Sequence, residues 1–317
     1  MAPTRDPIEL SPPDISAYQN GNTDIDYVTT YDSGVAGPHV MVNAVTHGNE
    51  LCGSIVVDFL FRQGVRPTRG KLTLSFANYQ AFLNFDKRHP GMSRYVDEDF
   101  NRLWSPDVLD GPRDSAEVRR AREMRPLIDT VDLLLDIHSM QTRAPALMLA
   151  GPLPKGRQLA GAVLVPEYVV CDEGHAAGKR MRDYGDFGNP DSPKNALLVE
   201  CGQHWESAST DVAMQTTLRF LKHCDVVDPA FIDEHLAATP PPQKFITVTD
   251  PITIKSDNFT FVDEFVGMEV IEKKGTVIGH DDAEPVTTPH DDCVLIMPSR
   301  RTAPGQTAVR LGQFISL

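Results

Sequence analysis

Short apolar runs alternate with amphipathic segments along most of this chain, and this alternation constrains the fold more than any other feature. The run "PHVMVNAVTH" (38–47) suits a strand buried on both faces, and residues 49–65 follow with apolar side chains at helical spacing. This alternation predicts an α/β fold with a mainly parallel mixed sheet flanked by helices. Further strands are expected at 71–78, 132–139, 146–151, 163–170 and 195–203, and further helices at 115–131 and 209–224.

The character of the sequence changes near a proline triplet at 240–242. A chain of 317 residues is long enough for one large domain and a smaller one. The prolines cannot continue a helix and favour an extended linker. Beyond them, short β-rich runs are separated by Gly, Pro and Asp, without helical periodicity. We therefore predict a catalytic α/β domain over residues 1–239 and a small all-β domain over residues 240–317.

The composition excludes several classes of partner and site. Hydrophobic residues make up 41% of the chain, enough for a sizeable core, and the formal net charge is −14. Because no Lys/Arg-rich run stands out, nucleic acid is not an expected partner. No apolar signal-peptide core or membrane-spanning run is present, so we expect a cytoplasmic protein that is not bound to membranes. The five cysteines are scattered and without a CxxC pair, which predicts reduced thiols.

Residues that can bind a metal ion stand at the carboxyl ends of predicted strands, where ligands gather in open α/β sheets. His47 and Glu50 leave the first long strand, and His138 ends "LLLDIH". Two histidines and one carboxylate are typical of a catalytic zinc site, which keeps one coordination position open. Imidazole nitrogen favours zinc over magnesium, so we expect one Zn2+ per chain, although this ligand set also accepts cobalt, manganese or iron.

A lone HxxE is more often structural, with His47 capping a helix and His138 an ordinary core residue. The metal site is favoured because a third ligand ends another strand, and because Glu200 ends a further one in "ALLVECGQ". Glu200 is not needed as a ligand. A carboxylate in this place is suited to act as general base toward metal-activated water and then to protonate the leaving nitrogen. The structural alternative for Glu200 is a buried charge paired with an arginine.

Four motifs occur in the order and approximate spacing of one enzyme family: "THGNE" (46–50), "RYVDEDFNR" (94–102), "LLDIHS" (134–139) and "LLVECGQ" (197–203). On these motifs the chain resembles the succinylglutamate desuccinylase and aspartoacylase family, a branch of the zinc carboxypeptidase superfamily. The tail with "GQTAVRLG" also resembles the family's C-terminal domain. The resemblance implies a metal-dependent hydrolase of linear amides, a zinc deacylase that cleaves an N-acyl amino acid or a related small amide. It also implies a small homo-oligomer.

The resemblance assigns roles to single residues as well. It implies that His47, Glu50 and His138 bind zinc and that Glu200 is the catalytic glutamate.

The motif at 94–102 matches the family's substrate-binding loop. Arg94 matches the arginine that polarises the scissile carbonyl and stabilises the oxyanion, and Asn101 and Arg102 match the pair that holds the substrate's α-carboxylate. These roles are physically reasonable, since a guanidinium offers a bidentate fork to a carboxylate and a fixed positive charge to an oxyanion. We expect Asp97 and Asp99 to orient these arginines or to hold the loop, not to be catalytic.

The sequence also departs from the family pattern. Acylases for N-acyl-aspartate carry an arginine about ten residues before the catalytic glutamate, whereas this chain has Pro190 near that place and Lys194 as the nearest cation. The tail contains no tyrosine, the last being Tyr184, so the tyrosine that this domain lends to aspartoacylase's pocket has no counterpart. Neither N-acetylaspartate nor N-succinylglutamate is therefore assigned as the substrate. Other side chains could line a different pocket or serve packing: Arg180, Arg182, His204 and Trp205.

Three alternatives stay open at this point. A carboxypeptidase acting on short peptides would use the same metal chemistry and the same recognition of an α-carboxylate. A cysteine hydrolase built on Cys201 and His204 is less favoured, because neither a strand-to-helix nucleophile elbow nor a third orienting group is evident. A non-catalytic metal- or ligand-binding homologue would have no need of Glu200 and Arg94.

Overall fold

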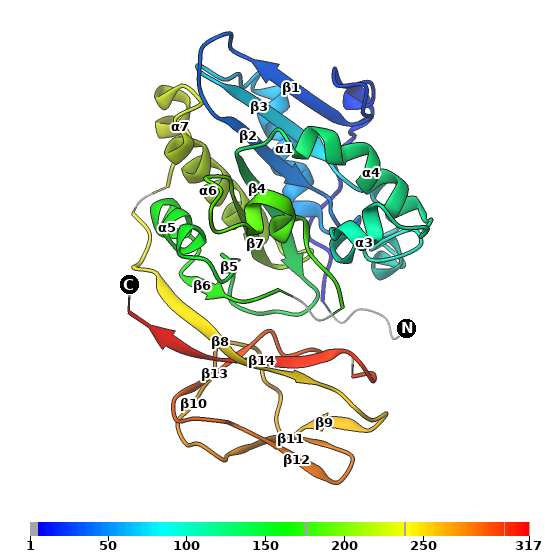
Figure 1. Cartoon of the computed structure of the whole chain (residues 1–317), viewed down its shortest axis with the longest axis vertical. Coiled ribbons are helices and arrows are strands. Elements are labelled where there is room, and N and C mark those ends of the chain that lie inside the picture. Colours follow the sequence, from blue (N-terminus) through cyan, green and yellow to red (C-terminus); the bar gives the residue numbers. More distant parts are fainter. Residues whose placement is uncertain (1–5, 175–176, 238, 301, 317) are drawn as a thin grey trace.

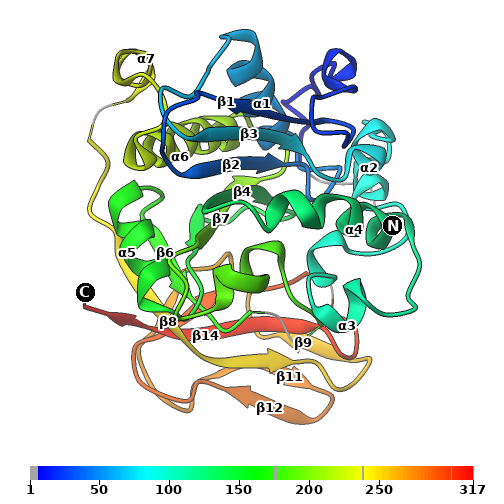
Figure 2. The same ribbon diagram turned by 45° about the horizontal axis from the view of Figure 1, so that its top comes forward.

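One mixed sheet runs through most of the molecule (Figures 1 and 2). The computed structural model describes residues 6–174, 177–237, 239–300 and 302–316, and within these the large sheet has the strand order β1-β3-β2-β4-β7-β5-β6-β8-β14-β13-β10. A small second sheet has the order β12-β11-β9. The strands are β1 (Val28–Asp32), β2 (His39–Ala44), β3 (Lys71–Phe76), β4 (Leu133–Met140), β5 (Leu147–Leu149), β6 (Tyr168–Cys171), β7 (Asn195–Gln203), β8 (Lys244–Thr253), β9 (Phe259–Phe261), β10 (Val270–Ile271), β11 (Val277–Asp281), β12 (Glu284–Thr287), β13 (Cys293–Ile296) and β14 (Thr307–Ile315).

Helices cover both faces of the first half of this sheet. The α-helices are α1 (Leu51–Arg62), α2 (Tyr79–Leu83), α3 (Pro106–Leu109), α4 (Ala116–Ile128), α5 (Pro154–Val163), α6 (Ser207–Cys224) and α7 (Pro229–His235). Short 3-10 helices are η1 (Ser16–Tyr18), η2 (Pro90–Ser93), η3 (Phe100–Arg102), η4 (Met181–Asp183) and η5 (Gly185–Gly188).

Side-chain alternation along β2 creates the two layers. Val40, Val42 and Ala44 belong to the core formed with α1 and α6, whereas Met41 belongs to the core formed with α4. Successive side chains of a strand point to opposite faces, so a strand covered on both sides is apolar throughout. The strands β3, β2, β4 and β7 are mutually parallel neighbours. The predicted fold class, a mixed α/β sheet flanked by helices, is confirmed.

One expected strand is partly wrong. Residues 163–170 do not form a strand throughout, because Val163 ends α5 and β6 begins only at Tyr168. Between them Leu164 takes a left-handed conformation with φ of +68°, which closes the helix. The apolar appearance of 163–165 comes from the buried side of α5, where Leu159, Ala160 and Val163 share one helical face.

The tail continues the sheet of the first part. β8 pairs in parallel with β6, and β14 pairs antiparallel with β8. Apolar side chains from both parts form one core cluster, which includes Leu147, Val170, Ile246 and Val294. From residue 243 to 316, the described residues contain strands and irregular segments but no helix. The boundary between residues 239 and 240 stays a prediction.

Among the described residues, no helix combines the length and the apolar character that crossing a membrane requires.

Candidate metal centre and active site

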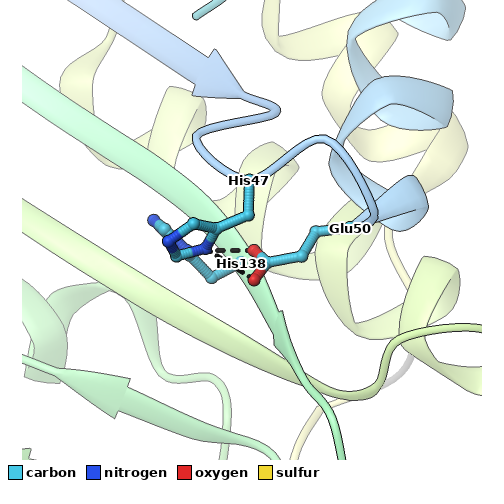
Figure 3. A group of neighbouring side chains, drawn as sticks. All are labelled: His47, Glu50 and His138. Atoms are coloured by element: carbon cyan, nitrogen blue, oxygen red, sulfur yellow. Dashed lines mark hydrogen bonds and ion pairs between the residues drawn. The ribbon is translucent and has the colours of Figure 1, made fainter. Parts of the chain in front are cut away.

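Three buried side chains from separate elements converge on one point (Figure 3). His47 lies in the loop after β2, Glu50 immediately precedes α1, and His138 lies on β4, and one ligand atom of each falls within 4.8 Å of the others. His47 Nδ1 lies 2.7 Å from Glu50 Oε1, and His138 Nδ1 lies 3.0 Å from Glu50 Oε2. Both Nδ1 atoms therefore face the same carboxylate. The structure brings together the three residues predicted as metal ligands.

The loop that carries His47 is held in an unusual conformation. Val45 is buried with a φ of +64°, a region that β-branched residues avoid, so the turn after β2 is strained. Gly48 lies against two other segments: a Cβ there would come within 2.3–2.4 Å of backbone atoms of Ala81, Phe82 and Ser93. Gly48 also donates its N–H to the carbonyl of Arg94 at 3.0 Å. The loop thus joins the metal centre to the segment around Arg94.

Two aspartates orient the two histidines. His138 Nε2 lies 2.8 Å from Asp136 Oδ2, and His47 Nε2 lies 2.9 Å from Asp99 Oδ1. A carboxylate at Nε2 stabilises the tautomer with the proton on that nitrogen, which leaves the Nδ1 lone pair free for a metal ion. Arg94 Nη2 also lies 2.9 Å from His47 Nε2, and of these two neighbours we assign the hydrogen bond to the carboxylate. Both rings therefore present Nδ1 to the same point.

The charges of the centre reinforce one another. Burial alone would raise the pKa of Glu50, but His47 and His138 hold that pKa well below its usual value. Burial would likewise lower the pKa of His138, but the carboxylates of Asp136 and Glu50 raise it well above its usual value. Glu50 is thus an anion, as a metal ligand must be, and His138 lies in a strongly negative environment that favours any cation.

Glu200 lies beside this group. It pairs directly with His138 across the parallel strands β4 and β7, so the two side chains share one face of the sheet. Its Oε2 atom is buried without a hydrogen-bond partner in the described part of the chain. Burial raises the pKa of Glu200 to about 8, against the opposing effects of His138 and Arg94. A cation at the centre would lower this pKa, because it stabilises the charged carboxylate.

The donor set fits a zinc ion. Two imidazole nitrogens and one carboxylate make up a catalytic zinc ligand set, and carboxylates behind the imidazoles are the usual second layer of such sites. The orphaned Oε2 of Glu200 marks a place where a water molecule can donate a hydrogen bond.

Arg94 projects toward the same centre. Its Nη2 lies 3.1 Å from Asp99 Oδ2, and its Nη1 lies 3.4 Å from Glu50 Oε1. Burial disfavours the charge, but Asp99 and Glu50 overcome this and raise the pKa of Arg94 above its usual value. Asp99 also lies beside His47, and despite its burial its pKa is held far below the usual range by His47 and Arg94. The expectation that Asp99 orients an arginine agrees with these contacts.

Asn101 and Arg102 follow on the same loop with different surroundings. Asn101 is buried, and its Oδ1 accepts a hydrogen bond from the backbone N–H of Met181 at 2.9 Å. Its side chain therefore joins this loop to η4. Arg102 Nη1 donates to the carbonyl of Asn101 at 2.7 Å. Burial lowers the pKa of Arg102, and the positive charges of Arg94, Arg180 and Arg310 lower it further, against the attraction of Asp99. Such a guanidinium favours an anionic ligand.

The first turn of α4 anchors the loop that carries Arg94 and Arg102. Glu117 is fully buried, and its carboxylate accepts hydrogen bonds from the backbone N–H groups of Val96, Asp97 and Glu98 at 2.6, 3.0 and 3.2 Å. Asp97 Oδ2 in return accepts from the N–H of Ala116, the first residue of α4, at 2.7 Å. Asp97 therefore holds the loop, as expected, and it does so by capping a helix.

Other residues singled out in the sequence have structural surroundings. Lys194 donates to the backbone carbonyl of Asp129, so it does not replace the missing arginine. Burial raises the pKa of Cys201 well above its usual value, which opposes a thiolate nucleophile. Trp205 is buried and donates from Nε1 to the carbonyl of Asn49 at 3.1 Å, which supports the metal loop. Arg182 donates to two backbone carbonyls and serves packing.

Asp136 was missed in the sequence. A signal for it was present, because residues i and i+2 of a strand share a face, and Asp136 precedes His138 by two residues in "LLDIHS". Its second oxygen accepts hydrogen bonds from Asn43 and Thr46 at 2.8 Å each.

Comparison with known proteins identifies the family. The sequence pattern of the succinylglutamate desuccinylase/aspartoacylase catalytic domain matches residues 36–224. The chain belongs to this family. The resemblance seen in the four motifs is thereby confirmed.

Individual relatives are more distant. N-acyl-aromatic-L-amino acid amidohydrolase (carboxylate-forming) A from Danio rerio is 36% identical over 115 residues, which is 32% of this chain and 32% of that protein. The match therefore spans about a third of that relative's length. The succinylglutamate desuccinylase from Chromobacterium violaceum has a TM-score of 0.66 at 17% identity, over 92% of this chain and 89% of its own.

The product-bound ectoine utilization protein EutE (DoeB) from Ruegeria pomeroyi has a TM-score of 0.63 at 16% identity, over 90% of this chain and 88% of its own. At such identities these two likenesses show the fold, and the shared fold extends over the tail.

Proposed function

We propose that this protein is a zinc-dependent amidohydrolase that cleaves the amide bond of an N-acyl amino acid to give a carboxylate and an amine. The observation that carries the proposal is the convergence of His47, Glu50 and His138 beside Glu200, whose buried Oε2 lacks a partner among the described residues. Family membership supports the reaction type, and the name of the Danio rerio relative supports an N-acyl amino acid as substrate.

A zinc ion held by these three residues would supply Lewis-acid activation of water and of the amide carbonyl. Glu200 takes a proton from the attacking water as general base and returns it to the leaving nitrogen as general acid. Its burial favours the protonated form, which aids the second of these steps.

Arg94 and Arg102 interact with different groups of the substrate. Arg94 stays charged through Asp99 and Glu50, so it offers a fixed positive group to the negative charge that develops on the carbonyl oxygen. In the described chain, no carboxylate lies within 4.0 Å of the Arg102 guanidinium, so most of its N–H groups are available to a ligand. Arg102 binds the substrate's α-carboxylate with help from Asn101.

The test is a substrate panel on metal-analysed protein. N-acetyl, N-formyl and N-succinyl amino acids, with aliphatic, aromatic and acidic side chains, are compared with dipeptides. We expect bound zinc and a higher kcat/KM for the N-acyl amino acids. A preference for dipeptides would instead favour the carboxypeptidase alternative. A metal-loaded protein that binds one N-acyl amino acid but hydrolyses none would favour the non-catalytic binder.

Glu200→Ala separates catalysis from metal binding. Because Glu200 is not a ligand in this proposal, the variant should keep its zinc while kcat falls about a hundredfold or more, as for loss of general acid–base help. Glu50→Ala is the matched control, since it removes a ligand and should lose zinc as well as activity. Full turnover in Glu200→Ala would remove this residue from the mechanism.

A further inference from the structure

One arginine of the tail reaches toward the candidate active site without a close partner. Arg310 lies on β14, in register with Ile296 of β13 and Pro251 of β8. Its side chain is only 12% exposed. In Figures 1 and 2, β14 lies next to β8, which in turn borders β6. Its position brings a long cationic side chain of the tail to the loop that follows β6.

The carboxylate nearest to Arg310 is already engaged. Arg310 Nε lies 3.8 Å from Asp172 Oδ2, too far for a hydrogen bond. Both oxygens of Asp172 accept hydrogen bonds from Arg180 instead, at 2.7 and 2.9 Å. Among the described residues, the guanidinium of Arg310 has no hydrogen-bond acceptor. Burying a charge without such partners is costly, so this position points to a ligand.

Arg102 has a similar deficit. Its one side-chain hydrogen bond within the described chain goes to a backbone carbonyl, and no carboxylate approaches within 4.0 Å. Arg310 is close enough to Arg102 and Glu200 for their charges to interact. Burial lowers the pKa of Arg310, and the attraction of Asp172 and Glu200 does not offset this. Two incompletely neutralised guanidinium groups thus lie near each other, and that of Arg310 also interacts with the charge of the general base.

We propose that Arg310 is a specificity-determining residue that binds a second carboxylate of the substrate, in addition to the α-carboxylate bound at Arg102. A guanidinium is suited to this role, because its fork makes two parallel hydrogen bonds to one carboxylate. The inference rests on the proposed function and narrows its substrate class to N-acyl amino acids with two carboxylates. The second carboxylate belongs either to the amino acid side chain or to the acyl group.

The experiment compares three probes that differ only in this group. N-acetylalanine has one carboxylate, N-acetylglutamate has a second on the amino acid, and N-succinylalanine has a second on the acyl group. For each, KM and kcat are measured with zinc-loaded protein, and the dissociation constant is measured with the Glu200→Ala variant. The dissociation constants test the inference even when no probe is hydrolysed.

We expect one of the two dicarboxylates to bind more tightly than N-acetylalanine. Arg310→Gln should weaken the binding of that dicarboxylate about 10- to 100-fold, as for loss of a charged hydrogen-bonding partner, and should affect the binding of N-acetylalanine much less. Arg310→Lys should restore part of the affinity, since it keeps the charge without the fork. Arg300→Gln, an exposed arginine of the same tail, is the matched control and should behave as wild type.

Several results would overturn the inference. Equal losses for all three probes in Arg310→Gln would show a structural role, and Arg310→Lys decides the point if the glutamine variant is unfolded. If the three probes were hydrolysed with equal kcat/KM and bound equally well, the role of Arg310 would be refuted, whereas the proposed function would still be supported. Absence of hydrolysis would count against the proposed function, whereas selective dicarboxylate binding that depends on Arg310 would still support this assignment.

Discussion

At the scale of single residues, the candidate centre depends on pairs in which a carboxylate stands behind an imidazole. Asp136 fixes His138, and Asp99 fixes His47, at distances of 2.8 and 2.9 Å. Each pair decides which ring nitrogen carries the proton and therefore which one is available to a metal ion. Asp99 also contacts Arg94, so one carboxylate serves both the ligand and the residue assigned to the oxyanion.

Asp136→Asn tests this arrangement. The variant removes the negative charge behind His138, so the ring should lose basicity and a fixed tautomer. We expect zinc affinity to fall about 10- to 100-fold, as for loss of a residue that supports a metal ligand. Affinity is measured by competition with a chromogenic chelator. Asp191→Asn, a change at an exposed aspartate, serves as the control, and equal affinities in the two variants would refute the role of Asp136.

The functional roles of these residues could be predicted from the sequence better than the contacts between them. His47, Glu50, His138 and Glu200 could be proposed because each lies in or just after a recognisable strand and matches a motif. The direct pairing of His138 with Glu200 depends on the register of β4 against β7, and no local pattern specifies that register. Arg310 could not be found in the sequence either, since a strand order that places β8 and β14 beyond β6 is needed to bring it near the site.

At the scale of secondary structure, α4 and the loop before it support each other. Glu117, in the first turn of the helix, accepts hydrogen bonds from three backbone N–H groups of the loop. Asp97, in the loop, accepts a hydrogen bond from the N–H of the first residue of the helix. Acidic side chains at a helix N-terminus are also favoured by the helix dipole. The loop that carries Arg94 and Arg102 is therefore fixed from both of its sides.

Glu117→Gln should loosen that loop. An amide keeps one oxygen but turns an N–H₂ group toward backbone donors, so at least one of the three hydrogen bonds is lost. We expect the free energy of unfolding to drop by about 2 kcal/mol, as for a hydrogen bond to a charged group, and kcat/KM to fall with it. Urea denaturation and steady-state kinetics measure the two effects.

Glu123→Gln on the same helix is the control for this prediction. Glu123 is exposed, and its partner Arg120 is buried but keeps hydrogen bonds to the carbonyls of Ala77 and Asp26, so the loss of Glu123 should change stability by only about 1 kcal/mol or less. If both variants were equally stable, Glu117 would not anchor the loop.

Elements with a clear period were the ones predicted well. The continuous apolar runs of β2, β4 and β7 and the helical spacing of α1 and α6 correspond to observed elements. Helix α5 was misread because its buried residues stand next to the apolar residues of β6, and short apolar runs do not distinguish a buried helix from a strand.

At the scale of the whole molecule, the proposed metal ion connects the loop between β2 and α1 to strand β4. Its ligands come from the loop after β2, from the residue before α1 and from β4. Because an ion bound to the folded state alone stabilises that state by mass action, zinc should raise Tm by about 5 °C at a hundredfold excess over its Kd.

Differential scanning calorimetry with zinc and then with a chelator measures this shift. His138→Ala should show almost no response, since it removes one of three ligands. A shift of equal size in that variant would place the ion elsewhere.

The hydrogen bonding of β6 to β8 has a practical consequence for anyone trimming this protein to its best-matched region. A fragment that stops before residue 240 would leave β6 as an open edge and would uncover Leu147, Leu149 and Val170. Unprotected strand edges with apolar neighbours recruit other chains. Such a fragment should therefore aggregate during expression, and light scattering of the shortened and full-length forms would show the difference.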